Sequence, residues 1–151
     1  MKKLVLTLVM FSIILVLVAC GNSEVEKTDG KQTEQVQADS LKSLENEGVG
    51  KYLADSKGMT LYYFTKDESG KSNCSGECLG NWPAFTEESF TVPEGYNQKD
   101  FGVITREENG IKQRTYKGYP LYYFVKDQKE GDINGQGVKD VWFVVNNETE
   151  F

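Results

Sequence analysis

The hydrophobic and polar positions divide the chain into three zones, of which the first is an apolar run at the N-terminus. Lys2 and Lys3 precede residues 4–19, which are apolar except for two hydroxyl side chains. A basic start, an apolar core and a small residue at its end are typical of a secretory signal peptide. The run is also shorter than the about 20 apolar residues that a membrane-spanning helix needs. The pattern therefore predicts that residues 1–19 are a signal peptide and belong to no fold.

The second zone, residues 20–49, is polar and contains no aromatic residue. It is rich in Glu, Lys, Gln, Ser, Thr and Asp, a composition that buries too little apolar surface to order the chain. We expect a flexible tether that holds a domain away from the membrane, with a transient helical turn over Ala38–Leu44.

The third zone, residues 50–146, has short runs of alternating apolar and polar residues separated by Gly-bearing turns. Asn109-Gly110 between two such runs is a strong hairpin signal, because both residues accept positive φ. Tight turns are also expected at Asp55–Gly58 and Lys117–Gly118. This pattern predicts an all-β fold, a small antiparallel domain of about seven strands, the clearest at Lys51–Ala54, Met59–Thr65, Phe101–Glu107, Ile111–Tyr116, Tyr119–Val125 and Val141–Asn146.

The third zone also repeats itself at an offset of about 60 residues. Lys57–Asp67 (KGMTLYYFTKD) recurs as Lys117–Asp127 (KGYPLYYFVKD), and Trp82 corresponds to Trp142. The two copies span about 50–86 and 101–146. Cysteine occurs in the first copy only, so the shared unit of the fold does not require it.

Within each copy the strand has large side chains on both faces. Alternation places Leu61, Tyr63 and Thr65 on one face and Tyr62, Phe64 and Lys66 on the other. The strand is thus either a core strand buried on both sides, the interpretation we favour, or one with an exposed aromatic strip. Asp67 and Asp127 follow the two strands and are expected to accept hydrogen bonds from the backbone of the next turn.

Composition narrows the classes of function. The chain has 17 Lys and Arg against 23 Asp and Glu, and loss of Lys2 and Lys3 with the signal leaves a net charge of −8. Without a basic cluster, binding to nucleic acid is not expected. The chain has no His, which removes the commonest general base, the Ser-His and Cys-His nucleophile systems and ordinary zinc or copper sites. We expect no catalytic residue, no bound metal and no cofactor, and an enzyme is the less favoured class.

Cys74 and Cys78 are the only cysteines of the third zone, and three interpretations of the pair stay open. A disulfide is favoured, because exported proteins face an oxidising compartment and a helical turn brings residues four apart within bridging distance. A soft-metal site such as one for Cu(I) is the second. A redox-active dithiol is the third, although active pairs are usually C-x-x-C, and Glu77 between the cysteines disfavours a thiolate.

The tetrad Leu17-Val18-Ala19-Cys20 resembles a bacterial lipobox. The resemblance implies that Cys20 becomes the first residue of the mature chain and carries a diacylglyceryl group, which anchors it to the extracytoplasmic side of the cell membrane. An ordinary signal peptide, or an N-terminal anchor helix, with an incidental cysteine is the alternative.

The duplicated Tyr-x-Phe-x-x-Asp motif, the Cys-Ser-Gly-x-Cys…Trp-Pro segment and the Trp-Phe-Val-Val ending together resemble the secreted-repeat lipoproteins of bacteria. That family has no established activity, so the resemblance implies an exported two-repeat lipoprotein and no catalytic residues. The residues themselves favour a non-catalytic binding or structural module with a cell-wall glycan or another envelope protein as partner. The alternative is an envelope redox, electron-transfer or soft-metal-handling protein that acts through Cys74 and Cys78. The expected binding face comprises Tyr62, Phe64, Asp67, Tyr122, Phe124, Asp127, Trp82 and Trp142.

Overall fold

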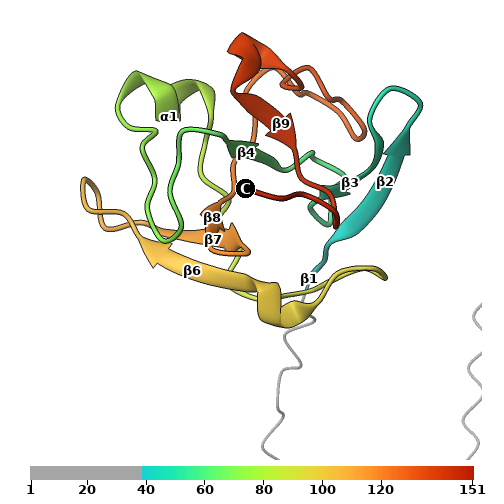
Figure 1. Cartoon of the computed structure of the whole chain (residues 1–151), viewed down its shortest axis with the longest axis horizontal. Coiled ribbons are helices and arrows are strands. Elements are labelled where there is room, and N and C mark those ends of the chain that lie inside the picture. The colour runs from blue at the N-terminus through green and yellow to red at the C-terminus, as the bar shows by residue number, and fades with distance from the viewer. Residues whose placement is uncertain (1–38) are drawn as a thin grey trace, which may run out of the picture. The chain divides into compact units, whose positions relative to one another are not determined.

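The computed structural model describes residues 39–151, in which most regular structure is β-strand (Figure 1). The predicted signal peptide, Cys20 and most of the predicted tether lie outside these residues. The helical elements are α1 (Glu77–Asn81) and two short 3-10 turns, η1 (Gln98–Asp100) and η2 (Val138–Asp140). The strands are β1 (Asp39–Ser40), β2 (Lys42–Asn46), β3 (Gly50–Ala54), β4 (Tyr62–Phe64), β5 (Phe90–Thr91), β6 (Phe101–Thr105), β7 (Lys112–Tyr116), β8 (Tyr119–Pro120) and β9 (Trp142–Val144). The predicted all-β fold is confirmed, with more and shorter strands than expected.

The strands form small sheets that are mostly antiparallel. β2 pairs with β3, β4 with β9, and β7 with both β6 and β8, whereas the two-residue pair of β1 and β5 is parallel. The predicted turn at Asn109-Gly110 joins β6 to β7, and Gly110 has the positive φ, 71°, that the turn requires. Lys117 and Gly118 join β7 to β8 with φ of 48° and 90°, and positive φ at both positions is the mark of a tight hairpin turn.

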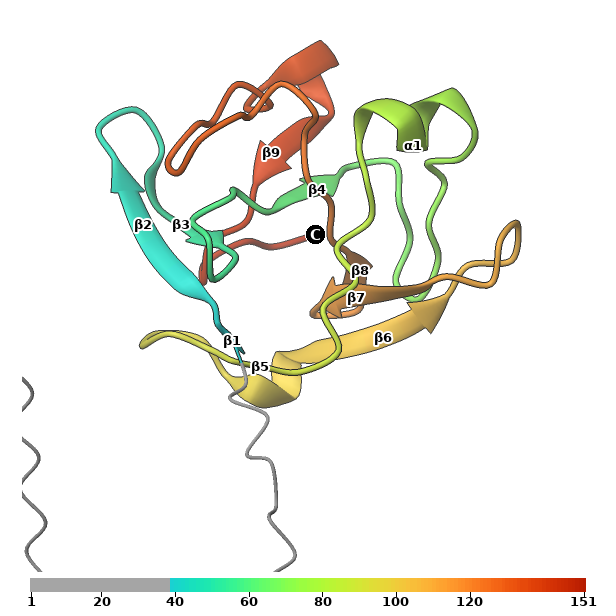
Figure 2. The same cartoon turned by 180° about the vertical axis from the view of Figure 1, so that it is seen from behind.

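The two repeats exchange strands. β4 of the first repeat pairs with β9 of the second, and the two lie side by side in both views (Figures 1 and 2). In the second repeat the Tyr123 N–H donates to the carbonyl of Pro83 at 2.8 Å, so the chain after β8 pairs with the chain after α1. The expected strand Tyr119–Val125 is regular only over β8 and continues as extended chain with such isolated pairings. Where the repeats meet, Tyr62 and Tyr122 each donate a backbone hydrogen bond of 2.9 Å to the other's carbonyl. Neither repeat therefore has complete strand pairing without its partner.

The alternation along the exchanged strands produces two hydrophobic clusters, one on each face. Leu61 and Leu121 lie in one cluster with Phe85 and Phe90, and Tyr62 and Tyr122 lie in the other. All of these side chains are buried. The central strands are thus buried on both faces, as the favoured interpretation of the pattern predicts. The second cluster carries the features described below.

The folded unit extends beyond the expected bounds of 50–146 at both ends. Residues 42–46, assigned to the tether by composition, form β2, and no helical turn is present over 39–44. The apolar side chains responsible are Leu41, which is buried in the first cluster, and Leu44, which packs against the second. Two leucines among polar residues suffice here because β3 supplies the backbone partners. At the other end, Phe151 stacks on Tyr119 with ring centroids 4.1 Å apart.

Candidate functional site

The tyrosine and the aspartate of the repeated motif bond crosswise between the repeats. The Tyr62 hydroxyl donates to Asp127 Oδ2 and the Tyr122 hydroxyl donates to Asp67 Oδ2, each at 2.6 Å. All four side chains are buried. Because the acceptor for each tyrosine lies in the other copy, the motif Tyr-x-Phe-x-x-Asp is a device that fixes two repeats to each other.

The other oxygen of each aspartate receives the backbone of the following loop. Asp67 Oδ1 accepts from the Asn73 N–H at 2.6 Å, and Asp127 Oδ1 accepts from the Asn134 N–H at 2.9 Å. The predicted turn-capping role is therefore seen in both copies. Burial raises the pKa of the Asp67 carboxyl to about 6, although the Tyr122 hydroxyl, the Asn73 N–H and Arg106 all oppose the shift.

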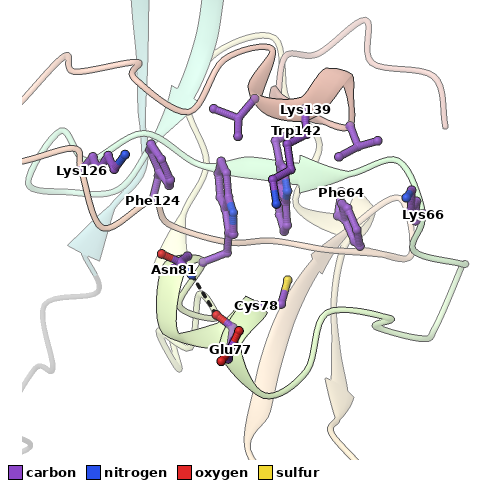
Figure 3. Close-up of a pocket in the computed structure, with 12 residues that line it drawn as sticks. Phe64, Lys66, Glu77, Cys78, Asn81, Phe124, Lys126, Lys139 and Trp142 are labelled. Atoms are coloured by element: carbon purple, nitrogen blue, oxygen red, sulfur yellow. Dashed lines mark hydrogen bonds between the residues drawn. The ribbon is translucent and has the colours of Figure 1, made fainter.

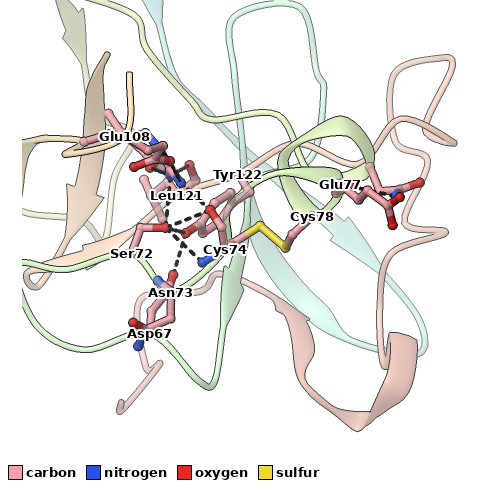
Figure 4. Close-up of a disulfide and its surroundings, with 12 residues drawn as sticks. Asp67, Ser72, Asn73, Cys74, Glu77, Cys78, Glu108, Leu121 and Tyr122 are labelled. Carbon is pink, nitrogen blue, oxygen red and sulfur yellow. Dashed lines mark hydrogen bonds and ion pairs between the residues drawn. A yellow bond between two sulfur atoms is a disulfide. The ribbon is translucent and has the colours of Figure 1, made fainter. Parts of the chain in front are cut away.

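The first loop carries the disulfide. Cys74 and Cys78 are bonded, with Cα atoms 5.3 Å apart (Figure 4). The Cys78 N–H donates to the Ser75 carbonyl, and the Trp82 N–H donates to the Cys78 carbonyl at 2.8 Å. The disulfide thus ties the segment before α1 to the second residue of this short helix, which leads directly to Trp82. Of the three interpretations of the pair, the structure contains the disulfide.

A buried arginine of the second repeat holds this loop by hydrogen bonds. Arg106, in the turn after β6, donates to the Cys74 carbonyl and to Gln113 Oε1, and its Nη1 lies 3.0 Å from Ser72 Oγ. Its charge is balanced by Glu108 at 2.5 Å. Ser72 Oγ in turn lies 2.6 Å from the Tyr122 hydroxyl. The disulfide loop is therefore connected to Tyr122 through Ser72, to which Arg106 also donates.

The second loop reaches the same tyrosine–aspartate layer without a crosslink. The Gly135 N–H donates directly to the Tyr62 hydroxyl at 3.2 Å. Gly135 occupies the place of Cys74, and a Cβ atom there would lie 2.8 Å from the Tyr62 ring and 2.9 Å from the Trp82 ring. A cysteine at this position would force one or both rings to shift, so the packing around Gly135 disfavours a cysteine in the second repeat.

Above the crosswise layer, the repeats deliver four rings to a single stack, which we term the aromatic row: Phe64, Trp142, Trp82 and Phe124. Neighbouring centroids are 4.3, 3.8 and 4.2 Å apart, and the two indoles are parallel to within 3°. Rings from the two repeats alternate along the stack. Phe64 of the first repeat stacks on Trp142 of the second, and Phe124 of the second stacks on Trp82 of the first. Such stacking adds about 0.5–1.5 kcal/mol per pair beyond burial.

The aromatic row lines a pocket of about 500 Å³ (Figure 3). Lys66 and Lys126, which occupy equivalent positions in the repeats, lie at opposite ends of the row, and Lys139 lies beside Trp142. All three lysines are exposed, and the ion pairs within residues 39–151, Lys42–Glu130 and Arg106–Glu108, do not involve them. Glu77 and Asn81 line the opposite side with Cys78. The pocket thus combines an apolar floor with an excess of uncompensated positive charge.

The eight residues of the expected binding face come together but in two layers. Phe64, Phe124, Trp82 and Trp142 line the pocket, whereas Tyr62, Tyr122, Asp67 and Asp127 form the buried layer beneath it. The second group therefore supports the surface and does not present itself to a ligand. The lysines and Arg106 were not expected from the sequence. The repeat carried a signal for two of them, since both lysines follow a Phe of the motif by two residues.

The part of the chain that the structure describes holds no group of three or more His, Cys, Asp or Glu side chains arranged to bind a metal ion. Among the same residues, no helix is long and apolar enough to cross a membrane.

The sequence profile of a lipoprotein family, described as a secreted repeat of unknown function, matches residues 45–86 and 102–146. The two matches cover the two repeats and together more than half of the chain. The chain belongs to this family. The resemblance given by the motifs is thereby confirmed, including its two copies, and this secreted-repeat lipoprotein has a fold that explains the motif. No match to the chain is found among the curated proteins or among the solved structures.

Proposed function

We propose that this lipoprotein is a non-catalytic binding module of the cell envelope and that its ligand site is the pocket over the aromatic row. The observation that carries the proposal is the use of four large rings from both repeats to line one pocket. Phe and Trp rings that line a pocket are common in sites that recognise other molecules. The match to a family of secreted repeats supports a site outside the cytoplasm.

Binding is favoured over catalysis by the roles of the ionisable groups. The chain has no His. Asp67 and Asp127, the buried acids nearest the site, are engaged by a tyrosine hydroxyl and a backbone N–H each. A general acid or base needs a free path to the substrate proton. These carboxylates have none, so their role is structural.

The experiment is a comparison of pocket and surface variants in envelope binding. The mature chain, residues 20–151, is mixed with the envelope fraction of the producing cells and sedimented. Phe64→Ala removes the half-buried ring at one end of the row and should reduce the bound fraction several-fold. Val125→Ala, a truncation of an exposed side chain outside the pocket, is the matched control and should bind as the parent does. Equal binding by both variants would contradict the proposal.

The alternative of a redox or soft-metal protein has one observation in its favour, because Cys78 lines the same pocket. Against it, Cys74 is fully buried, which leaves the Cys78 sulfur as the one point at which an external thiolate could attack this disulfide. Joint replacement of Cys74 and Cys78 by Ala separates the two. A binding module should lose stability yet still sediment with the envelope, whereas a redox protein should lose thiol-dependent electron transfer.

We further propose that the lipid on Cys20 anchors the module to the extracytoplasmic side of the cell membrane. Its support is the lipobox-like tetrad and the lipoprotein family. Cys20→Ala should release the chain from the membrane fraction and abolish incorporation of labelled palmitate; retention with label would overturn the assignment.

A further inference from the structure

The two indole N–H groups of the aromatic row have no hydrogen-bond acceptor within residues 39–151. An indole nitrogen is a donor only, and a buried Trp usually finds an acceptor for it. Trp82 and Trp142 are only 5% and 3% exposed. Yet the side-chain polar atoms that are sealed from solvent without a partner in the described residues are Glu87 Oε2 and Tyr96 Oη, and no indole nitrogen is among them. The two N–H groups therefore reach solvent at the pocket and stay free to donate.

The ring faces are not free in the same way. Trp82 is covered on one face by Trp142 at 3.8 Å and on the other by Phe124 at 4.2 Å, and Trp142 is covered by Trp82 and by Phe64 at 4.3 Å. A neutral sugar that stacks on an indole face would find both faces occupied. What the indoles offer a ligand is their edges, and the polar part of each edge is a hydrogen-bond donor.

The charged side chains around the pocket also favour a ligand with hydrogen-bond acceptors. Lys66, Lys126 and Lys139 face one acid, Glu77, in a chain whose net charge is −6. Lys139 is also one of the few non-glycine residues held at positive φ, 53°, a conformation that costs about 1 kcal/mol or more and is often found where a side chain serves a site. A local excess of cations and N–H donors on an acidic protein is complementary to anionic oxygen atoms.

The two-fold relation between the repeats adds length to the site. Lys66 and Lys126 occupy equivalent positions and lie at the two ends of the row, with the indoles between them (Figure 3). A ligand that satisfies both ends has to extend along the row and carry negative groups at more than one point. A single small anion meets at most one end.

From these observations we infer that the pocket binds an extended anionic polymer with phosphate or carboxylate groups spaced along its length. This inference rests on the proposed function and specifies its ligand class. The lysines hold anionic groups along the row, and the indole N–H groups of Trp82 and Trp142 donate to oxygen atoms at its centre.

The test uses the mature chain and three polymers: polygalacturonate, which carries carboxylates, its methyl ester, which has the same backbone without charge, and inorganic polyphosphate. The chain has two Trp residues, so a ¹H–¹⁵N spectrum contains two indole signals, which the variants Trp82→Phe and Trp142→Phe assign. We expect at least one anionic polymer to shift both indole signals and the methyl ester to shift neither. A response to one anion alone identifies the phosphate or the carboxylate source.

Lysine variants provide the second readout. If three lysines neutralise charges of the polymer, log Kd should change by about 2 per log unit of salt concentration. Each of Lys66→Gln and Lys126→Gln should weaken binding about two- to five-fold and lower this salt dependence. Lys112→Gln, an exposed lysine on β7 that does not line this pocket, is the matched control.

The inference would be overturned by no binding of either anion, by equal binding of the methyl ester, or by binding that Lys66→Gln and Lys126→Gln leave unchanged. Binding to anionic lipid vesicles in place of the polymers would also overturn it. The proposed function fails separately, since it requires that Phe64→Ala weaken binding to the whole envelope fraction. A module that binds envelopes but ignores anionic polymers keeps the function and loses this ligand.

Discussion

The two repeats place the same residues in the same layer and hold the connecting loop by different means. In the first, the loop is closed by the disulfide and clasped by Arg106 through the Cys74 carbonyl. In the second, the Gly135 backbone bonds directly to the Tyr62 hydroxyl, and Gln136 Oε1 accepts from the β9 backbone at 2.8 Å. The shared part ends at the asparagine that bonds to each aspartate, Asn73 or Asn134, and begins again at the Trp.

This difference separates what the fold requires from what each loop adds. The crosswise tyrosines and the two indoles each contact the other repeat, so a change in one copy is felt by both. Each loop contacts this layer at few points, so the fold accepts any loop that places a Trp in the aromatic row. A disulfide in one copy and Lys139 in the other are compatible with one fold for this reason, and they make the two sides of the pocket unlike.

Truncation of either indole should break what the repeats share and have the largest effect. Trp82→Ala and Trp142→Ala each remove a buried ring stacked on both faces and should lower the free energy of unfolding by about 3–5 kcal/mol. Urea denaturation followed by circular dichroism measures both. Val103→Ala, at a side chain that is 47% exposed, should change it by less than about 0.5 kcal/mol. A large cost at one Trp and none at the other would show that the repeats do not depend on each other equally.

Loss of the disulfide should remove the main difference between the repeats. Replacing Cys74 and Cys78 by Ser opens a very small loop, for which the chain-entropy relation gives about 2 kcal/mol of destabilisation. The fold should persist, because the second repeat holds the equivalent loop without a crosslink. The midpoint of thermal unfolding with and without reductant provides the measurement, with the double variant expected to be insensitive to reductant. Complete unfolding of the double variant would mean that the first loop cannot be held as the second is.

Removal of one tyrosine hydroxyl should sharpen the comparison further. Tyr62→Phe and Tyr122→Phe each leave a buried aspartate without one hydrogen bond, at a cost of about 1–2 kcal/mol. Tyr122→Phe also deprives Ser72 Oγ of a partner, but Arg106 and the Cys74 N–H still bond to that oxygen. Tyr62→Phe leaves the Gly135 N–H with no replacement. Hydrogen exchange of the Gly135 amide should therefore accelerate more in Tyr62→Phe than exchange of the Cys74 amide does in Tyr122→Phe. Equal acceleration at the two amides would contradict the proposed hydrogen-bond network.

The sequence predicted the repeat, the β class and the turns because each depends on local chemistry or on self-similarity. Asn109-Gly110 and Lys117–Gly118 are turns in any context that flanks them with extended chain. Residues 42–46 were missed because β2 has few apolar side chains and is held by pairing with β3, a non-local contact. The aromatic row was missed for the same kind of reason: the motif gives each ring's face on its strand, but only strand exchange brings Trp82 against Trp142. Arg106 carried no signal, since the groups that it holds in the first loop, Ser72 Oγ and the Cys74 carbonyl, lie in the other repeat.

The smallest predicted effect is a pH dependence that originates in the first repeat. The Asp67 carboxyl has its pKa raised to about 6, chiefly by burial, from an ordinary value near 4. A raised pKa means that the folded state holds the proton more tightly than the unfolded state, so this group stabilises the fold at low pH and the contribution is lost as the pH rises through about 6. Integrated between pH 7 and pH 5, it should add about 1 kcal/mol to the free energy of unfolding at the lower pH.

Asp67→Asn keeps the shape of the side chain but cannot titrate. It should therefore remove that increment from the difference in the free energy of unfolding between pH 5 and pH 7. Urea titrations at pH 5 and pH 7 of the parent and the variant measure the increment. Glu94→Gln, at an exposed acid in the loop between the repeats, serves as the control and should leave the difference unchanged. The pKa of Asp127 is raised by burial as well, so part of the pH dependence should survive in Asp67→Asn. If the free energy of unfolding of the variant and of the parent rises equally between pH 7 and pH 5, the buried Asp67 is not the group that responds. The repeats would then differ in their disulfide and not in this pH dependence.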